Sequence, residues 1–270
     1  MIMRFVNTRV GEREISVSQL GFGCARLFGG VEKRYASRML EHAYELGIRH
    51  FDTAPSYGHG QSENILGDVF AGVADITVMT KVGVPRPAGS PSLASVVRRL
   101  TLRRVLSHVP VLKKRLLLRA QPSATPEVAR PTRALERHVV LRALDDSLKR
   151  LRRDYIDFYC VHEPDQYVID EDLLAVFDNL KASGVICAHG LACGRQAPMA
   201  PAGWDVIQAQ YVPKCPRDGR LRFFHGVLRS TESNAAARLA AALQEERDAV
   251  FIVSASERHQ LTNLARRIAV

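Results

Sequence analysis

Four side chains with acid–base chemistry stand at or just after the ends of apolar segments in this chain. They are Asp52, Tyr57, Lys81 and His162. The phenol of a tyrosine in water has a pKa of about 10 and is a poor proton donor at neutral pH. An ammonium group within a few ångströms stabilises the phenolate and lowers that pKa. We therefore expect Lys81 to make Tyr57 a better proton donor, while the carboxylate of Asp52 keeps the lysine charged.

The fourth residue, His162, can hydrogen-bond to a carbonyl oxygen and hold that oxygen beside Tyr57. Such a set of residues protonates an oxygen while another group attacks the neighbouring carbon. No serine or cysteine of the sequence stands in a recognisable nucleophile motif. The residues therefore favour an external attacker, and a hydride from a nicotinamide fits.

Alternating strands and helices are expected to position these residues. Strands are predicted at 48–52, 75–80 and 155–161, and the four side chains end or follow them. In a closed barrel of parallel strands the strand ends share one rim, which is where active sites form. Residues far apart in the sequence are therefore expected to meet at one place.

Further segments of the chain complete the pattern of a (β/α)8 barrel. Strands are expected at 16–23, 185–192, 204–210, 221–228 and 250–254. Helices are expected between most of them, and one at 135–151 would carry Leu141, Leu144, Leu148 and Leu151 on one face. Eight strands alternating with helices predict the barrel, preceded by an N-terminal β-hairpin that turns near Gly11. The connections at 193–203 and 211–220 are too short for full helices.

Most of the positive charge is concentrated in one segment of the 270-residue chain. The formal net charge is +10, and residues 86–132 contain ten lysines and arginines against one acid, which gives 10 − 1 = +9. We interpret the chain as a single barrel domain, residues 1–270, with a basic helical insertion at 86–132 after the third strand. The insertion could be a flap that packs on the barrel, a lid that attracts an anionic substrate, or a membrane-surface or nucleic-acid contact.

Several classes of protein and site are disfavoured. Aromatic residues do not interleave the basic ones at 86–132, so no nucleic-acid partner is expected. The five cysteines are irregularly spaced without a C-x-x-C pair, so neither a disulfide framework nor a metal site is predicted. No apolar run approaches about 18 residues and the start lacks a signal-peptide core, so we expect a cytoplasmic protein without a transmembrane segment. The oligomeric state is left open.

The wording of the motifs resembles the aldo-keto reductase family. The matching segments are LGFGCARLFGG (20–30), FDTAPSYGHGQSENILG (51–67), MTKVG (79–83), LDDSLKRLRRDYIDFYCVHEPD (144–165) and DVIQAQY (205–211). The similarity is dense over 16–83 and 135–211, weaker from 221 onward and absent over 86–132. It implies a barrel that uses NADPH or NADH to reduce an aldehyde, ketone or sugar-type carbonyl, or to perform the reverse oxidation.

The resemblance also assigns roles to individual residues. It implies that Tyr57 is the proton donor, that Lys81 and Asp52 tune it, and that His162 orients the substrate. The implied cofactor contacts are Gly23, Gln208, Phe224, Ser254, Ser256 and Arg258. Gln208 would bind the nicotinamide carboxamide, and either Phe224 or His225 would stack on the nicotinamide ring. The acids that follow His162, Glu163 and Asp165, are interpreted as solvated surface residues.

Two departures from the family pattern keep other functions open. Relatives typically carry a serine and an asparagine after the fifth strand, where this chain reads GLAC at 190–193. The glycine-rich loop expected after the seventh strand is shortened to residues 229–233. The chain could therefore be a non-catalytic member of the family that senses or scaffolds, or a barrel that performs acid–base chemistry without a cofactor.

Overall fold

A computed structural model describes residues 3–27, 32–87, 133–194, 201–213, 217–228 and 235–268. The chain divides into two compact units, and these residues all belong to the unit formed by residues 1–87 and 132–270. The segment expected to be a basic helical insertion, 86–132, lies outside the described residues except for 86 and 87. So does the shortened loop at 229–233. Both expectations stay predictions.

The strands of the described residues form a closed parallel barrel in the order β10-β3-β4-β5-β6-β7-β8-β9. Its eight strands are β3 (Leu20–Gly23), β4 (His50–Asp52), β5 (Thr77–Val82), β6 (Ile156–His162), β7 (Ile186–Ala192), β8 (Val206–Gln210), β9 (Leu221–His225) and β10 (Ala249–Val253). Strands that follow one another in the chain are paired, and the last strand pairs with the first. This closure leaves no exposed strand edge, and it confirms the predicted barrel.

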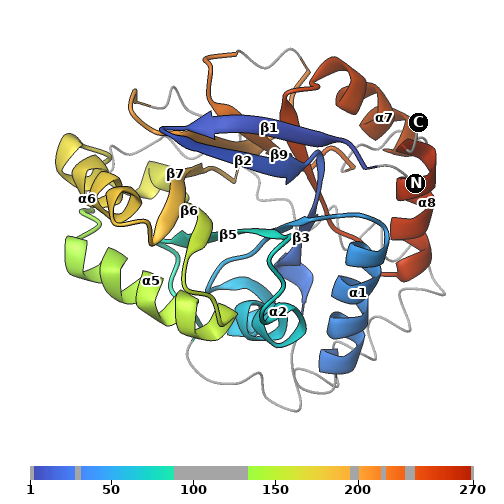
Figure 1. Cartoon of the computed structure of the whole chain (residues 1–270), viewed down its shortest axis with the longest axis horizontal. Helices are drawn as coiled ribbons and strands as arrows, with labels where there is room; N and C mark the ends of the chain where they lie inside the picture. The colour runs from blue at the N-terminus through green and yellow to red at the C-terminus, as the bar shows by residue number, and fades with distance from the viewer. Residues whose placement is uncertain are drawn as a thin grey trace, which may run out of the picture. The chain divides into compact units, whose positions relative to one another are not determined.

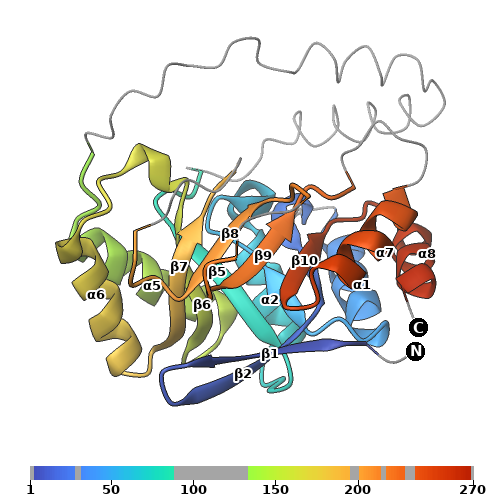
Figure 2. The ribbon, with the colours of Figure 1, turned by 90° about the horizontal axis from the view of Figure 1, so that it is seen from above.

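Helices surround the barrel (Figures 1 and 2). They are α1 (Lys33–Glu45), α2 (Ser62–Phe70), α5 (Arg137–Leu151), α6 (Glu171–Ala182), α7 (Ala235–Glu245) and α8 (Arg258–Ile268). The described parts of the β7–β8 and β8–β9 connections contain no helix, in line with their short length. No helix of the described residues is both long enough and apolar enough to cross a membrane.

The buried face of α5 differs from the predicted one by about one residue. Leu144 and Leu151 are buried as expected, but Leu141 is 37% exposed and Val140 is completely buried. In a helix, residues three and four positions apart share a face. Val140, Leu144 and Leu151 therefore form the stripe that packs on the barrel, and Leu141 lies at its edge.

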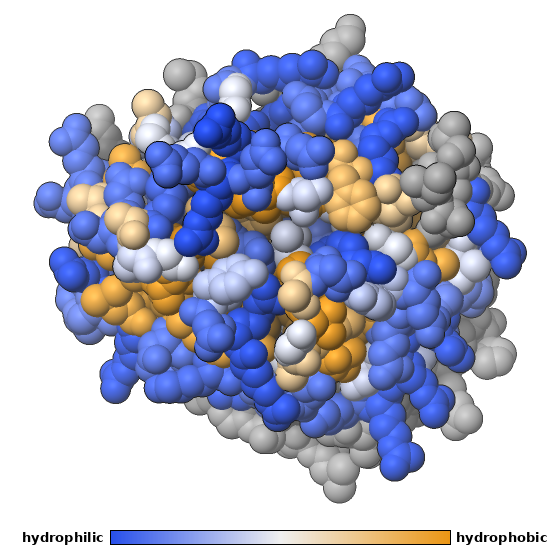
Figure 3. Space-filling model, viewed as in Figure 1, coloured by the Kyte–Doolittle hydropathy of each residue, from blue (hydrophilic) through white to orange (hydrophobic). Residues whose placement is uncertain are grey.

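An N-terminal hairpin precedes the barrel, as predicted. Its strands are β1 (Phe5–Val10) and β2 (Arg13–Ser18). The turn contains Gly11 with φ of 59°, a left-handed conformation that glycine adopts without strain. Val6 and Val17 pack in one apolar cluster with Phe158 and Phe223 from inside the barrel. The hairpin therefore covers the end of the barrel where the strands begin (Figure 2). The face that carries it is mostly hydrophilic, with apolar areas interrupted by polar ones (Figure 3).

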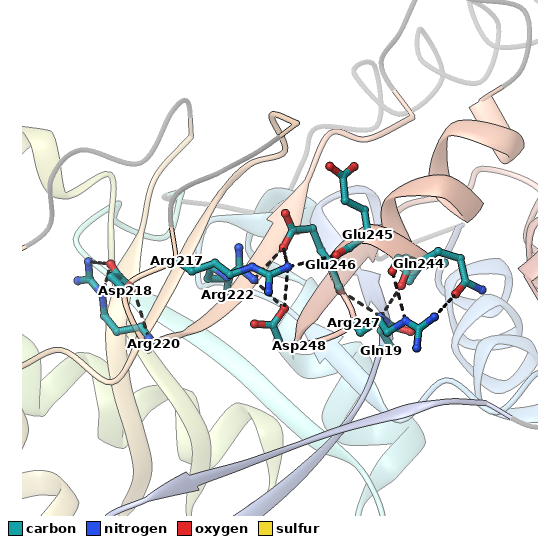
Figure 4. A network of polar contacts seen from close by, with 11 residues as sticks. Gln19, Arg217, Asp218, Arg220, Arg222, Gln244, Glu245, Glu246, Arg247 and Asp248 are labelled. Atoms are coloured by element: carbon teal, nitrogen blue, oxygen red, sulfur yellow. Dashed lines mark hydrogen bonds and ion pairs between the residues drawn. The ribbon is translucent and has the colours of Figure 1, made fainter.

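A buried arginine ties the beginnings of β9 and β10 to the end of α7 (Figure 4). Arg222 is 2% exposed, and its Nη2 donates to Glu246 at 2.9 Å and to Asp248 at 2.8 Å. Arg217 also donates to Glu246, at 3.2 Å. The side-chain amide of Gln19 reaches the carbonyl oxygen of Glu246 at 3.2 Å. Because a buried charge must be paired, this network holds the strand beginnings in register, at the opposite end of the barrel from the strand ends.

Candidate active site

The ends of the barrel strands surround a pocket of about 560 Å³. Residues from β3, β4, β6, β7, β8, β9 and β10, or from the loops that follow these strands, line it. Of the sequence-predicted site residues, the lining includes Gly23, Asp52, Tyr57, His162, Gln208 and Ser254. The rim therefore brings together residues that are up to 231 positions apart in the sequence, such as Gly23 and Ser254.

Lys81 and Asp52 form a buried ion pair at the base of this pocket. Nζ of Lys81 lies 2.5 Å from Oδ1 of Asp52 and donates to the carbonyl oxygen of Thr53 at 2.9 Å. Only 1% of the lysine side chain and 6% of the aspartate side chain are exposed. Burial alone would lower the pKa of Lys81, but the nearby Asp52 carboxylate and Tyr57 raise that pKa above its ordinary value. The lysine therefore remains charged.

Tyr57 follows β4 in a short turn that depends on glycine. Nζ of Lys81 lies 4.7 Å from the centre of its ring. The next residue, Gly58, has φ of 57°, and a Cβ placed there would approach the carbonyl oxygen of Leu27 to 1.6 Å. A side chain at this position would therefore displace the loop that carries Tyr57.

The pKa of Tyr57 is raised above its ordinary value, which differs from the sequence-based prediction. Burial is the largest cause, and the charge of Lys81 lowers the pKa by less than burial raises it. The prediction that Lys81 lowers the pKa of Tyr57 is correct. The prediction that this pKa lies below its ordinary value overall is wrong. Loss of water around the phenol is a property of the folded pocket, which residue types do not reveal.

His162 ends β6 and lies against Tyr57. The two rings are 5.6 Å apart between centres and nearly perpendicular, at 83°. The residue is 9% exposed, and within the described part of the chain its Nδ1 has no hydrogen-bond partner. Burial lowers the pKa of His162 to about 3, so the ring is neutral at physiological pH. A neutral imidazole carries one N–H, which can donate to a substrate oxygen.

Gln208 makes a contact that the sequence did not predict. Its Nε2 donates to Oδ1 of Asp52 at 3.0 Å, and the residue is 4% exposed. The donor stands on β8 and the acceptor on β4, which are separated by three strands in either direction around the barrel. The Asp52 carboxylate therefore contacts both Lys81 and Gln208, the residue expected to bind the cofactor.

The other predicted cofactor residues fall into two groups. Gly23 and Ser254 line the pocket, and Oγ of Ser254 donates to the carbonyl oxygen of Gly23 at 3.0 Å. A Cβ at Gly23 would lie 2.6 Å from that hydroxyl, so the absence of a side chain allows Ser254 to pack closely against β3. Ser256 and Arg258 are exposed near the beginning of α8 and are not among the residues that line the pocket.

The packing of Phe224 contradicts its expected stacking on a nicotinamide. Its ring packs against Tyr211 and Phe251, at centre distances of 5.5 and 5.6 Å, and only 1% of the residue is exposed. Successive residues of a strand point to opposite faces, so Phe224 faces the helices and His225 faces the pocket. His225, the alternative from the sequence, lines the pocket, where its Nε2 lies 3.0 Å from the carbonyl oxygen of Cys193.

The residues at the end of β7 that depart from the family pattern lie in the pocket wall. Ala192 and Cys193 both line the pocket. Burial, followed by the charge of Glu163, raises the pKa of the Cys193 thiol to about 12, so the thiol is protonated and a poor nucleophile. No described group of three or more histidines, cysteines or acids is arranged to hold a metal ion.

Glu163 is a pocket residue that sequence reasoning assigned to the solvated surface. It directly follows His162 and has φ of 52°. Its Oε2 accepts a hydrogen bond from the backbone N–H of Gly194 at 3.2 Å. The sequence held no signal for this position, because a glutamate before Pro164 also fits an exposed turn. The contact with Gly194 exists only once β6 and β7 are paired.

Comparison with known proteins identifies the family of this chain. A family model described as "Aldo/keto reductase family" matches residues 19–213. The chain belongs to this family. Its β4, β5 and β6 motifs are therefore family motifs, as the resemblance implied.

The curated relatives include enzymes that are named for sugar substrates. The chain is 30% identical over 188 residues to a D-threo-aldose 1-dehydrogenase of a Pseudomonas species, a match that covers 66% of this chain and 50% of the relative. It is 26% identical over 185 residues to a 6-dehydroglucose reductase of Novosphingobium aromaticivorans, covering 68% and 50%. An uncharacterized Bacillus subtilis oxidoreductase, YqkF, is 28% identical, with 68% and 47% covered. The chain thus spans about half the length of the curated relatives it matches.

Solved structures share the fold at low sequence identity. A putative aldo-keto reductase of Pseudomonas aeruginosa has a TM-score of 0.68 and 19% identity, covering 97% of this chain and 94% of that one. An aldo-keto reductase of Klebsiella pneumoniae in complex with NADPH has a TM-score of 0.65 and 16% identity, covering 100% and 91%. These matches agree with the barrel topology.

Proposed function

We propose that this aldo/keto reductase family member is an oxidoreductase that uses NADPH or NADH to reduce an aldehyde, ketone or sugar-type carbonyl. In the reverse direction it would oxidise an alcohol or lactol. One observation carries this function: Tyr57 and His162 face each other in one pocket, and the buried Lys81–Asp52 pair lies beneath the tyrosine ring. The names of two relatives, an aldose dehydrogenase and a dehydroglucose reductase, favour a sugar-type substrate.

The protein's own residues would handle the proton. The neutral ring of His162 donates a hydrogen bond to the carbonyl oxygen and holds it beside the hydroxyl of Tyr57. Tyr57 then transfers its proton to that oxygen, and the ammonium of Lys81 stabilises the phenolate that remains. The Asp52 carboxylate keeps Lys81 charged. In the oxidative direction the phenolate accepts the proton of the alcohol.

The pocket has features that fit a nicotinamide cofactor. Gly23 and Ser254 line one side of the pocket, and the amide of Gln208 presents its nitrogen to Asp52 so that its oxygen remains as an acceptor. Gln208 and Ser254 would hold the cofactor, with His225 at the pocket wall. When bound, the nicotinamide would supply or accept the hydride.

A second candidate function rests on Ala192 and Cys193. Neither provides a side-chain amide or hydroxyl at the end of β7, where the family pattern implies both. Weak cofactor binding would then leave a barrel that senses or scaffolds, or one that moves protons without hydride transfer. Binding of the nucleotide distinguishes these functions from the first.

The experiment is a titration with NADPH and NADH followed by nucleotide fluorescence, and then assays with sugar aldehydes. We expect micromolar binding of one nucleotide, on the order of −8 kcal/mol. Tyr57→Phe should reduce turnover by about a hundredfold or more while nucleotide affinity changes by less than about threefold. Turnover of Tyr57→Phe at the parental rate would exclude Tyr57 as the proton donor. Absence of binding at millimolar nucleotide would favour the second candidate.

A further inference from the structure

Glu163 introduces a negative charge beside the two residues that would contact a substrate oxygen. It directly follows His162 and lines the same pocket as Tyr57. The residue is half-buried, whereas Asp165, two positions later, is exposed and is not among the lining residues. The two acids of the turn after β6 therefore differ in their access to the pocket.

The main chain and the side chain of Glu163 are both held by the end of β7. Its N–H donates to the carbonyl oxygen of Ala192 at 2.8 Å, and its Oε2 accepts from the N–H of Gly194 at 3.2 Å. A Cβ on Gly194 would approach Oε1 of Glu163 to 2.3 Å, so the carboxylate occupies the space that a side chain at position 194 would take. These contacts fix the carboxylate at the pocket wall.

No described cation neutralises this carboxylate. Glu163 forms no ion pair with any lysine, arginine or histidine of the described residues. Lys81 is already paired with Asp52 at 2.5 Å. The charge of Glu163 reaches Tyr57, where it adds to burial in raising the tyrosine pKa. A substrate seated between Tyr57 and His162 would experience the same field.

We propose that Glu163 is a specificity-determining residue that disfavours anionic carbonyl substrates and favours neutral, hydroxyl-rich or cationic ones. This inference rests on the proposed function, because it concerns the same pocket. A carboxylate or phosphate near the carbonyl would face a like charge that no described cation pairs, in a partly desolvated site. Hydroxyl groups would instead donate to the carboxylate oxygen that Gly194 does not bind, and cations would be attracted by its charge. The anionic substrate considered from the sequence depended on residues 86–132, which the structure does not describe.

The test compares benzyl alcohols whose para substituents are anionic, neutral or cationic. The probes are 4-carboxybenzyl alcohol, 4-(hydroxymethyl)benzyl alcohol and 4-(trimethylammonio)benzyl alcohol, titrated by calorimetry in the presence of NADPH, which cannot oxidise them. We expect the parent protein to bind the cation about tenfold more tightly than the anion, as expected for charges several ångströms apart at intermediate dielectric. In Glu163→Gln the ratio of the two dissociation constants should approach one.

Two control variants separate the pocket charge from other effects. Asp165→Asn removes the same charge from the same turn at an exposed position and should leave the ratio within about twofold, because water and salt screen it. Glu163→Asp keeps the charge and should keep the sign of the preference. Glutamine at 163 can still accept from Gly194, so we expect Glu163→Gln to fold, which its melting temperature would verify.

The outcomes separate this inference from the proposed function. Equal binding of anion and cation by the parent protein, an equal change in Asp165→Asn and Glu163→Gln, or no binding of any alcohol would overturn the inference. The corresponding aldehydes test the chemistry separately. Charge-selective binding without turnover of any aldehyde would leave the role of Glu163 intact and contradict the oxidoreductase function.

Discussion

Gln208 and Asp52 meet across the barrel, with Nε2 of the amide 3.0 Å from Oδ1 of the carboxylate. The same carboxylate oxygen lies 2.5 Å from Nζ of Lys81. Because a carboxylate only accepts hydrogen bonds, the amide must present its NH2 group to Asp52. Its own oxygen then points away from Asp52. One carboxylate thus positions both the lysine beneath Tyr57 and the amide expected to bind a cofactor.

Removing the amide of Gln208 should weaken nucleotide binding. Gln208→Met keeps the length of the side chain but can neither donate to Asp52 nor accept from a ligand. We expect the dissociation constant for the preferred nucleotide to rise about tenfold, the effect of one lost hydrogen bond in a buried site. Fluorescence titration measures it. The matched control is Gln210→Met, a half-buried position two residues along β8 that does not line the pocket. Equal losses in both variants would assign the effect to the strand.

Breaking the Lys81–Asp52 pair should reduce both activity and stability. Lys81→Met leaves the Asp52 carboxylate buried without its cation, which costs about 3–5 kcal/mol of unfolding free energy. Turnover should fall at least about a hundredfold, because the phenolate of Tyr57 loses its stabilising charge. Urea unfolding and steady-state assays measure the two effects.

A double variant distinguishes the two roles of that pair. Lys81→Met with Asp52→Asn removes both charges, so much of the lost stability should return while turnover stays low. If the double variant were as unstable as Lys81→Met alone, the buried charge of Asp52 would not be the cause of the instability. Recovery of turnover in the double variant would contradict a role for Lys81 in proton transfer.

The buried ring of His50 should make stability depend on pH. Burial lowers its pKa from 6.5 to about 3, so the unfolded chain binds a proton that the folded chain rejects. Stability from this residue is present above pH 6.5 and is lost as the pH falls towards 3. Between pH 7 and pH 5 we expect a loss of about 2 kcal/mol from His50.

Variants at two histidines test this expectation. His50→Leu should remove that part of the pH dependence, measured as urea-unfolding free energies at the two pH values. His138→Gln is the control, because 73% of the His138 side chain is exposed and its removal should leave the slope unchanged. A slope in His50→Leu that equals the parental slope would show that another group binds the proton.

The sequence by itself determined the architecture and predicted which side chains with acid–base chemistry would meet. Strand and helix patterns are local, since they depend on side-chain periods of about 2 and 3.6 residues, and these predicted the barrel and its hairpin. Because parallel strands end on one rim, Asp52, Tyr57, Lys81 and His162 could be assigned to one site before any distance was known. The family motifs carry the same information.

Only the tertiary structure decided which neighbouring side chains face the pocket and how charges act there. The register of β9 in the closed barrel decides that His225, and not Phe224, faces the pocket. The pocket position of Glu163 depends on Gly194, and the Gln208–Asp52 contact depends on strands that face each other across the barrel. The raised pKa of Tyr57 follows from burial. All of these involve residues distant in sequence or loss of water on closure, and local periodicity encodes neither.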